Sequence, residues 1–152
     1  DEKLFMSETS REVAAAILVG TCGRILLQQR DDVPGILYPG MIGLFGGHRE
    51  GDETPLACAL REIEEEIGYR VAPERLEPLV TLRLTYPDSS LVTGSFFILR
   101  DVPVETLVVT EGSLLAVQAF ELPDLLRRMT PSACLITRLF MLRVETPTGP
   151  AM

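Results

Sequence analysis

Carboxylates crowd one short stretch of the chain, residues 46–69, GGHREGDETPLACALREIEEEIGY. Against two arginines and no lysine, this stretch holds seven acidic residues: Glu50, Asp52, Glu53, Glu62, Glu64, Glu65 and Glu66. Carboxylate oxygens are the ligands that hard divalent cations such as Mg²⁺ and Mn²⁺ prefer, with water and substrate phosphate completing the coordination. The crowding therefore has two interpretations, a solvated acidic surface or a cation site.

The second half of the stretch has the pattern of an amphipathic helix. Thr54 and Pro55 form a helix start, because a hydroxyl cap is followed by a residue already fixed near helical φ. Gly68 is a natural stop. At about 100° per residue, four apolar side chains fall on one stripe that must pack on a sheet. They are Leu56, Leu60, Ile63 and Ile67.

Three glutamates share one flank of this predicted helix. Residues three and four positions apart are neighbours on a helix surface, so Glu62 lies beside both Glu65 and Glu66. Each like-charge pair of this kind costs about 0.2–0.5 kcal/mol. Glu64 points elsewhere and can serve solubility alone. We therefore favour a cation site over a solvated acidic surface.

The spacing of the whole stretch resembles the Nudix box, G-x5-E-x7-R-E-U-x-E-E-x-G-U, in which U is an aliphatic residue. Gly47, Glu53 and the run 61–68 occupy every fixed polar position of that pattern. Tyr69 stands where the family usually has an aliphatic residue, at a position expected to serve packing. The chain is thus similar to the Nudix hydrolases over the length of the box.

This resemblance implies an α/β fold, an α/β/α sandwich with a mixed β-sheet. It also implies a metal-dependent pyrophosphohydrolase that cleaves the diphosphate bond of nucleoside diphosphates linked to another moiety, with Mg²⁺ or Mn²⁺ as cofactor. Water attacks phosphorus while the cation polarises phosphoryl oxygens and helps to deprotonate the water. One alternative is a nucleotide-sensing module of the same fold without turnover, and another is an enzyme that transfers at carbon, as GDP-mannose hydrolases do. The intact box argues against both.

Carried onto this sequence, the resemblance assigns metal binding to five residues. Glu62 and Glu66 are the expected principal ligands, and Glu65 beside them is a ligand or the base. The carbonyl of Gly46 is the expected backbone ligand. Glu53 is expected to orient the loop or to bind a metal through water.

The same resemblance leaves the general base open. It is either a box glutamate or Glu111, which lies between two predicted strands beside a glycine. Asp101 and Glu105 are weaker candidates. Arg61 is grouped with the catalytic residues, and its expected role is an ion pair with Glu53.

Arg30 and His48 are the candidate substrate contacts. Arg30 resembles the arginine that many relatives direct toward a substrate phosphate, and His48 lies beside the glycine pair, where it could contact phosphate. For both, the alternative is an ordinary polar surface residue. A tyrosine at the place of Tyr86 resembles the subgroup that acts on diadenosine polyphosphates, and a proline at the place of Pro87 resembles the ADP-ribose subgroup. The two residues point to different substrates, so neither decides the substrate. Oxidised nucleoside triphosphates and nucleotide sugars also stay open as substrates.

Four phenylalanines are candidates for a base-stacking platform, although strand aromatics more often belong to the core: Phe45, Phe96, Phe97 and Phe120.

The elements that must position the site follow from alternating apolar patterns and turn residues. They are strands at 12–20 and 25–30 around a turn at Gly23, a loop at 31–43, strands at 76–86, 91–100 and 114–122, and helices at 123–128 and 131–145 with Thr130 as N-cap.

The 152 residues, 46% of them hydrophobic, suffice for one packed domain. We expect a flexible segment at 1–10, the domain at 11–146 and a frayed tail at 147–152. The net charge of −8 argues against a nucleic-acid polymer as partner and fits a small-molecule nucleotide bound through a cation.

The apolar runs are too short to cross a membrane, so no membrane association is expected. The first residues lack the basic-then-apolar order of a secretion signal. Three dispersed cysteines without paired spacing predict a cytoplasmic protein with no disulfides. Because similar proteins often form dimers, a homodimer is an open expectation.

Overall fold

The computed structural model describes residues 11–86 and 88–145, with the backbone alone for 143–145. The expected flexible segment 1–10, the expected tail 147–152 and Pro87 lie outside the described residues.

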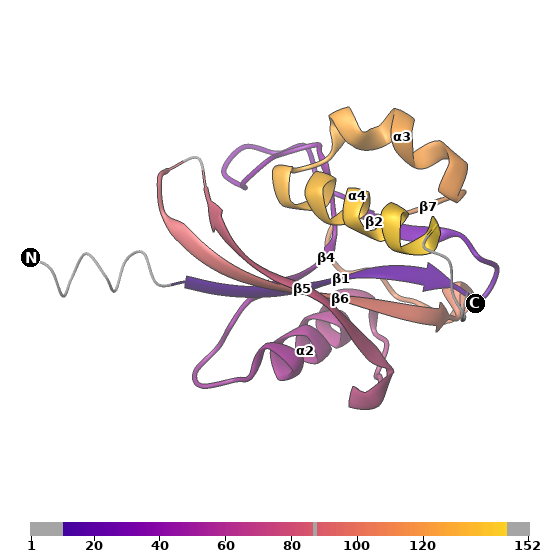
Figure 1. Cartoon of the computed structure of the whole chain (residues 1–152), viewed down its shortest axis with the longest axis horizontal. Coiled ribbons are helices and arrows are strands. Elements are labelled where there is room, and N and C mark those ends of the chain that lie inside the picture. The colour runs from indigo at the N-terminus through magenta and orange to yellow at the C-terminus, as the bar shows by residue number, and fades with distance from the viewer. Residues whose placement is uncertain (1–10, 87, 146–152) are drawn as a thin grey trace, which may run out of the picture.

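A single mixed sheet runs through the centre of the protein (Figure 1). Its strands are β1 (Arg11–Gly20), β2 (Ile25–Gln29), β3 (Ile42–Gly43), β4 (Phe45–His48), β5 (Leu76–Thr85), β6 (Leu91–Val102) and β7 (Ser113–Val117). The order is β3-β2-β1-β6-β5, with β4 paired to β1 and β7 paired to β2. The β1–β6 pairing is parallel and the others are antiparallel.

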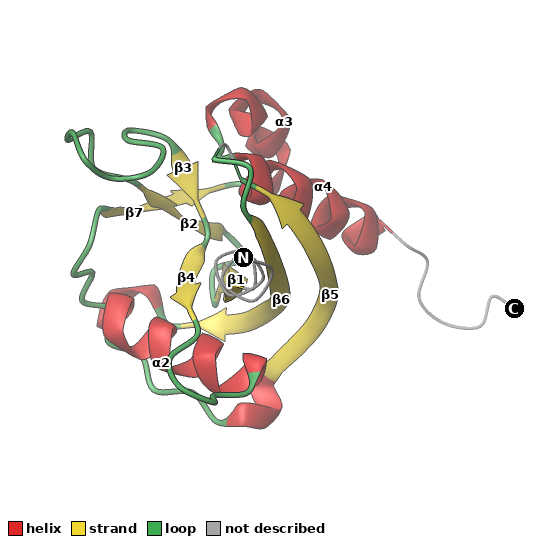
Figure 2. Ribbon diagram, turned by 90° about the vertical axis from the view of Figure 1, so that its left-hand side faces the viewer, coloured by secondary structure: helices red, strands yellow, loops and turns green. Residues whose placement is uncertain are grey.

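Helices cover both faces of this sheet, with α2 (Pro55–Ile67) on one face and α3 (Leu122–Leu125) and α4 (Pro131–Glu145) on the other (Figures 1 and 2). Side chains of β1 alternate between the two layers, as a strand requires. Ala16 and Leu18 join the apolar cluster that contains Ile63 of α2. Ile17 joins the cluster that contains Phe140 of α4. The predicted α/β/α sandwich is confirmed.

The acidic helix has the predicted boundaries. The Thr54 hydroxyl accepts a hydrogen bond from the Ala57 N–H at 3.1 Å, and Gly68 ends the helix in the left-handed region at φ 67°. Ile63 and Ile67 are fully buried. The caps fix where α2 begins and ends, and the buried apolar stripe fixes how the helix is turned against the sheet. Together they determine which flank of α2 carries the glutamates.

Three predicted elements differ in extent. The loop expected at 31–43 ends before Ile42, because Ile42–Gly43 pairs with the end of β2 as strand β3. The strand expected at 114–122 ends at Val117, because Gln118 and Glu121 form a capping box that starts a 3₁₀ helix at Ala119–Glu121. The helix expected at 123–128 is an α-helix only over Leu122–Leu125 and continues as a 3₁₀ helix. The predicted cap of α4 is present, since the Ala133 N–H donates to the Thr130 hydroxyl at 3.3 Å.

The three cysteines are free: Cys22, Cys58 and Cys134. Within the part of the chain that the structure describes, no helix is long and apolar enough to cross a membrane.

Strand β4 packs so closely on its neighbours that a side chain at Gly46 would meet rigid backbone and one at Gly47 would displace a carboxylate. A Cβ on Gly46 would lie 2.2 Å from the Ala14 carbonyl oxygen of β1. A Cβ on Gly47 would lie 2.3 Å from a carboxylate oxygen of Glu62. The glycine pair thus lets β4 lie against β1 and lets a carboxylate of α2 lie against β4.

Replacing Gly46 with alanine should therefore destabilise the protein by at least about 3 kcal/mol, the upper end of the usual cost of overpacking, because the new methyl group meets rigid backbone. Gly23→Ala is the matched control. Gly23 also has a positive φ, 88°, but a Cβ there meets nothing within 4 Å. Its cost should be about 1–2 kcal/mol from backbone conformation alone. Chemical denaturation measures the free energy of unfolding of both variants. Equal losses of stability would contradict the close approach of β4 to β1.

Candidate active site

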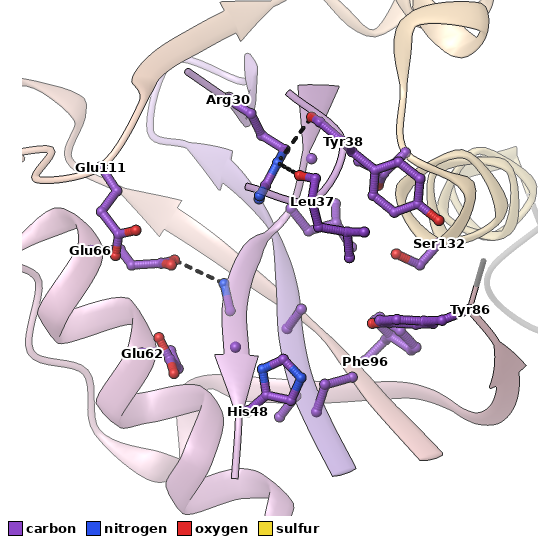
Figure 3. Close-up of a pocket in the computed structure, with 18 of the residues that line it drawn as sticks. Arg30, Leu37, Tyr38, His48, Glu62, Glu66, Tyr86, Phe96, Glu111 and Ser132 are labelled. Atoms are coloured by element: carbon purple, nitrogen blue, oxygen red, sulfur yellow. Dashed lines mark hydrogen bonds between the residues drawn. The ribbon is translucent and has the colours of Figure 1, made fainter. Parts of the chain in front are cut away.

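A cavity of about 440 Å³ lies between β4, the flank of α2 and the loop that follows β2 (Figure 3). Six of the residues predicted for the site line it: Arg30, Gly46, His48, Glu62, Glu66 and Glu111. Figure 3 shows Glu62, Glu66 and Glu111 together on one side. Tyr38, Tyr86 and Ser132 lie on the opposite side. The cavity therefore has an acidic end and an aromatic end.

Glu66 is the buried carboxylate of the acidic end, with 6% of its surface exposed. One of its oxygens accepts a hydrogen bond from the Gly46 backbone N–H at 2.9 Å. Burial, followed by the charges of Glu62 and Glu111, raises its pKa to about 8. Among the described residues, no arginine or histidine forms an ion pair with Glu66. Its second oxygen is thus left to bind something else.

Glu62 lies one turn before Glu66 and packs against Gly47, whose missing side chain makes room for it. Burial is the main cause that raises its pKa, and Arg61 acts in the opposite direction. The Arg61 guanidinium donates a hydrogen bond to the Glu62 carboxylate at 3.3 Å, but the same guanidinium also serves three other glutamates. Two neighbouring carboxylates on α2, Glu62 and Glu66, thus face the cavity with incomplete charge compensation.

Arg61 is shared among four glutamates of the stretch, Glu50, Glu53, Glu62 and Glu65. Its guanidinium pairs with Glu53 at 2.7 Å, which is the predicted ion pair, and with Glu65 at 3.1 Å. A longer contact of 3.4 Å reaches Glu50. Its remaining nitrogen donates to the His48 carbonyl at 2.9 Å. Hydrogen bonding to Glu53 is the main cause that raises the pKa of Arg61. Arg61 thus fixes the loop before α2.

Glu53 and Glu65 are turned toward Arg61 and do not line the cavity. Glu65 has 56% of its side chain exposed. The two weaker candidates for the general base, Asp101 and Glu105, also lie outside the cavity lining, at the end of β6 and in the 3₁₀ helix Val104–Thr106.

Glu111 reaches the cavity because its loop is hydrogen-bonded to the end of α2. The Thr110 N–H donates to the Glu66 carbonyl at 2.9 Å, and the Thr110 hydroxyl donates to the Glu65 carbonyl at 2.9 Å. Gln28 of β2 donates to the Glu111 carbonyl at 3.2 Å. These bonds bring a carboxylate 45 positions away in sequence beside Glu66 (Figure 3).

Arg30 and His48 also face the cavity. Arg30 uses its Nε to hold the loop after β2, donating to the Leu37 carbonyl at 2.9 Å and the Tyr38 carbonyl at 3.3 Å. Partial burial, and next the charge of Arg11, lower the pKa of His48, so its imidazole is neutral at pH 7. Arg30 supplies a positive charge to the cavity and His48 a neutral ring.

The donor set at the acidic end fits a hard divalent cation. Glu62, Glu66 and Glu111 offer carboxylate oxygens to one cavity, and within the part of the chain that the structure describes the buried Glu66 has no cationic partner. No group of three or more acidic, histidine or cysteine side chains among the described residues is already gathered into a ligand cluster. The side chains are therefore not yet arranged as a coordination shell, but their donor atoms suit such a cation, because carboxylates are the ligands that Mg²⁺ and Mn²⁺ select.

Sequence reasoning did not predict two residues of the aromatic end, Tyr38 and Ser132, and named Tyr86 only as a substrate cue. Tyr38 lies in a Pro/Gly-rich loop, and Ser132 lies in the first turn of α4. Neither belongs to a spacing pattern, so no local signal could have found them. Of the four phenylalanines, Phe96 lines the cavity, while Phe45 and Phe97 are core residues and Phe120 is 79% exposed.

Comparison with known proteins connects this geometry to one family. The model of the NUDIX domain family matches residues 9–139. No curated protein sequence matches.

Solved structures with a similar fold include the MutT protein from Methanosarcina mazei Go1, with a TM-score of 0.76 and 15% identity over 91% of this chain and 98% of that chain. The E. coli dihydroneopterin triphosphate pyrophosphohydrolase has a TM-score of 0.67 and 21% identity over 87% of this chain and 95% of that chain. A bifunctional NMN adenylyltransferase/ADP ribose pyrophosphatase from Francisella tularensis, complexed with AMP and a manganese ion, has a TM-score of 0.66 and 18% identity over 91% of this chain and 44% of that chain.

The family match covers most of the chain and contains the acidic helix, the glycine pair of β4 and Glu111. Enzymes of this family act on small nucleotide substrates and generally use divalent metals. The chain belongs to the NUDIX family and is a hydrolase that acts on pyrophosphate bonds.

Proposed function

We propose that this enzyme cleaves the diphosphate bond of a nucleoside diphosphate linked to another moiety, with Mg²⁺ or Mn²⁺ as cofactor. The observation that carries the proposal is the acidic end of the cavity. Four glutamates line the cavity, Glu50, Glu62, Glu66 and Glu111, and the most buried of them, Glu66, has no cationic partner among the described residues. A cation held between these oxygens and a substrate diphosphate compensates both sets of negative charge.

Glu62 and Glu66 are the proposed principal metal ligands, together with the carbonyl of Gly46. A bound cation supplies the polarisation of phosphoryl oxygens and assists deprotonation of the attacking water. Glu65 and Glu53 have supporting roles in this proposal, because Arg61 holds both beside the principal ligands. Glu65 and Glu53 would contact a metal either through a water molecule or directly after their ion pairs with Arg61 break.

Arg30 and His48 are the proposed contacts of the substrate diphosphate. Both line the cavity, and Arg30 has two terminal nitrogens beyond the Nε that holds the loop. A guanidinium supports bidentate binding of phosphate oxygens. The neutral imidazole of His48 can donate a hydrogen bond without adding charge.

Glu111 is the proposed general base. It lies on the same side of the cavity as Glu66, while the alternative Glu65 points to Arg61 outside the cavity. A base must lie within reach of the proton that it removes, so position favours Glu111 over Glu65.

The net charge of −8 supports a small nucleotide, and not a nucleic-acid polymer, as the partner. We also propose that the protein is cytoplasmic, has no membrane partner and forms a homodimer.

Glu66→Gln should lower kcat at least about 100-fold, the scale of losing positioned metal or acid–base chemistry. The measurement is release of phosphate or nucleotide from a panel of nucleoside diphosphate derivatives in the presence of Mg²⁺ or Mn²⁺. Glu64→Gln is the matched control, because Glu64 lies on the same helix and pairs with the exposed Arg70. Near-wild-type turnover of Glu66→Gln would refute its role as a ligand.

The same variant should be more stable than the wild type in a metal chelator, by about 1–3 kcal/mol, the cost of burying a poorly compensated polar group. The amide keeps an acceptor for the Gly46 N–H and replaces a carboxyl group whose ionised form is disfavoured in the folded state by burial and by Glu62 and Glu111. Thermal unfolding with a chelator measures this gain. Loss of both stability and activity would indicate a purely structural role for Glu66.

Glu111→Gln should lower kcat at least about 100-fold, the range of general acid–base catalysis, with KM nearly unchanged. Glu105→Gln, at an acidic residue outside the cavity lining, is the control and should keep full activity. Steady-state kinetics with the best substrate of the panel measures both. An unchanged rate for Glu111→Gln would assign the base to the box glutamates.

A further inference from the structure

The connection from β6 to β7 is bonded to the end of α2. The last carbonyls of a helix have no partner within the helix, and residues of this connection bind three of them. The Val108 N–H donates to the Ile67 carbonyl at 3.0 Å, and the Thr110 N–H donates to the Glu66 carbonyl at 2.9 Å. The Thr110 hydroxyl donates to the Glu65 carbonyl at 2.9 Å. The helix that carries the proposed metal ligands therefore ends on the segment that carries the proposed general base.

The same segment is held from its other side by β2. Gln28 is buried, and its side-chain amide donates to the Glu111 carbonyl at 3.2 Å. Gly112 has a positive φ of 64° and lets the backbone approach β2, because a Cβ there would lie 2.4 Å from the Gln29 carbonyl oxygen. The backbone of Glu111 is thus fixed between α2 on one side and β2 on the other.

Two of these anchors are side chains, the hydroxyl of Thr110 and the amide of Gln28. Backbone bonds form with many residue types, whereas these two bonds depend on the residue present. Gln28 follows three buried apolar residues of β2, and a buried amide is costly unless it is hydrogen-bonded. Neither Gln28 nor Thr110 lines the cavity. Any effect of the two side chains on the reaction must therefore pass through the residues that they hold.

We propose that Thr110 and Gln28 are positioning residues that hold Glu111 where it can remove a proton from the attacking water. This inference rests on the proposed function, in which Glu111 is the general base. A base works only within hydrogen-bond reach of its proton, and Glu111 lies outside the helices and strands. Because its segment is bonded to the end of α2, the base keeps one position relative to Glu62 and Glu66.

Removal of either side-chain anchor should slow turnover without weakening substrate binding. Thr110→Val and Gln28→Met should each lower kcat at least about fivefold, because a catalytic group displaced by about 1 Å can cost about 100-fold. KM should stay within about twofold, since Glu111 acts on water. Thr110→Ser keeps the hydroxyl and should retain the wild-type kcat. Unchanged kcat in both Thr110→Val and Gln28→Met would overturn the proposal.

The chain offers a matched control for each change. The Thr106 hydroxyl donates to the Pro103 carbonyl at 2.9 Å, in the same connection but not to α2. The Gln29 amide, the next residue of β2, donates to the Gly40 carbonyl at 2.9 Å, in a different loop. Thr106→Val and Gln29→Met should keep kcat within about twofold. A loss of kcat in these controls as large as in the anchor variants would refute the positioning roles.

A double-mutant cycle shows whether the effect passes through Glu111. In the Glu111→Gln background, adding Thr110→Val should lower kcat by less than about twofold, because no base is left to position. A general structural defect would add its full factor and would overturn the proposal. Calorimetry should show that Thr110→Val binds Mn²⁺ within about twofold of the wild type. A loss of Mn²⁺ affinity equal to the loss of kcat would show that Thr110 acts through Glu66 instead.

Amide hydrogen exchange tests the anchors without any turnover. The Val108 and Thr110 amides should exchange at least about fivefold faster in Thr110→Val and in Gln28→Met than in the wild type, the scale of one lost hydrogen bond. They should exchange at the wild-type rate in Gln29→Met. Unchanged exchange in both anchor variants would refute the anchoring.

The outcomes distinguish the positioning roles from the proposed function. A large loss of kcat in Glu111→Gln, with full kcat in Thr110→Val and Gln28→Met, would refute the positioning roles and leave the function intact. Faster exchange in both anchor variants, in a protein that hydrolyses none of the panel, would support the anchors and refute the function.

Discussion

The hydrogen bond from the Gly46 N–H to the Glu66 carboxylate joins the sheet to the acidic helix, and the site depends on it. It forms because β4 carries glycines where β1 and α2 approach closely. A side chain at Gly46 would push β4 from β1, and one at Gly47 would displace Glu62. The two glutamates of α2 thus reach the cavity only because the facing strand lacks side chains.

Charge compensation divides the acidic stretch into two groups. Arg61 binds Glu53 and Glu65 and fixes the loop before α2. Glu62 shares Arg61 with them, Glu66 has no cationic partner among the described residues, and burial makes the negative charge of both Glu62 and Glu66 costly. Such a cost is common at functional sites, where stability is lost in favour of ligand binding. In the proposed function a divalent cation and the charge of Arg30 offset it.

Local patterns predicted the parts of the fold that depend on local geometry. The caps at Thr54 and Gly68 and the apolar stripe of α2 follow from helix periodicity, and the strand pairs follow from alternation and turn residues. Contacts that no spacing pattern marks escaped prediction, whether local or distant in sequence. The capping box at Gln118 shortened one strand, and the loop held by Arg30 brought Tyr38 to the cavity. Sequence patterns named Glu111 only as one alternative, since its approach to Glu66 depends on hydrogen bonds from the Thr110 loop to α2.

The proposed function requires that Glu62 and Glu66 bind a divalent cation at the acidic end of the cavity. A crystal structure of the protein with Mn²⁺ tests it most directly, because anomalous scattering identifies the ion and its ligands. Manganese should be bound by both carboxylates next to the Gly46 carbonyl. Density that leaves Glu62 and Glu66 without a metal at saturating Mn²⁺ would contradict it.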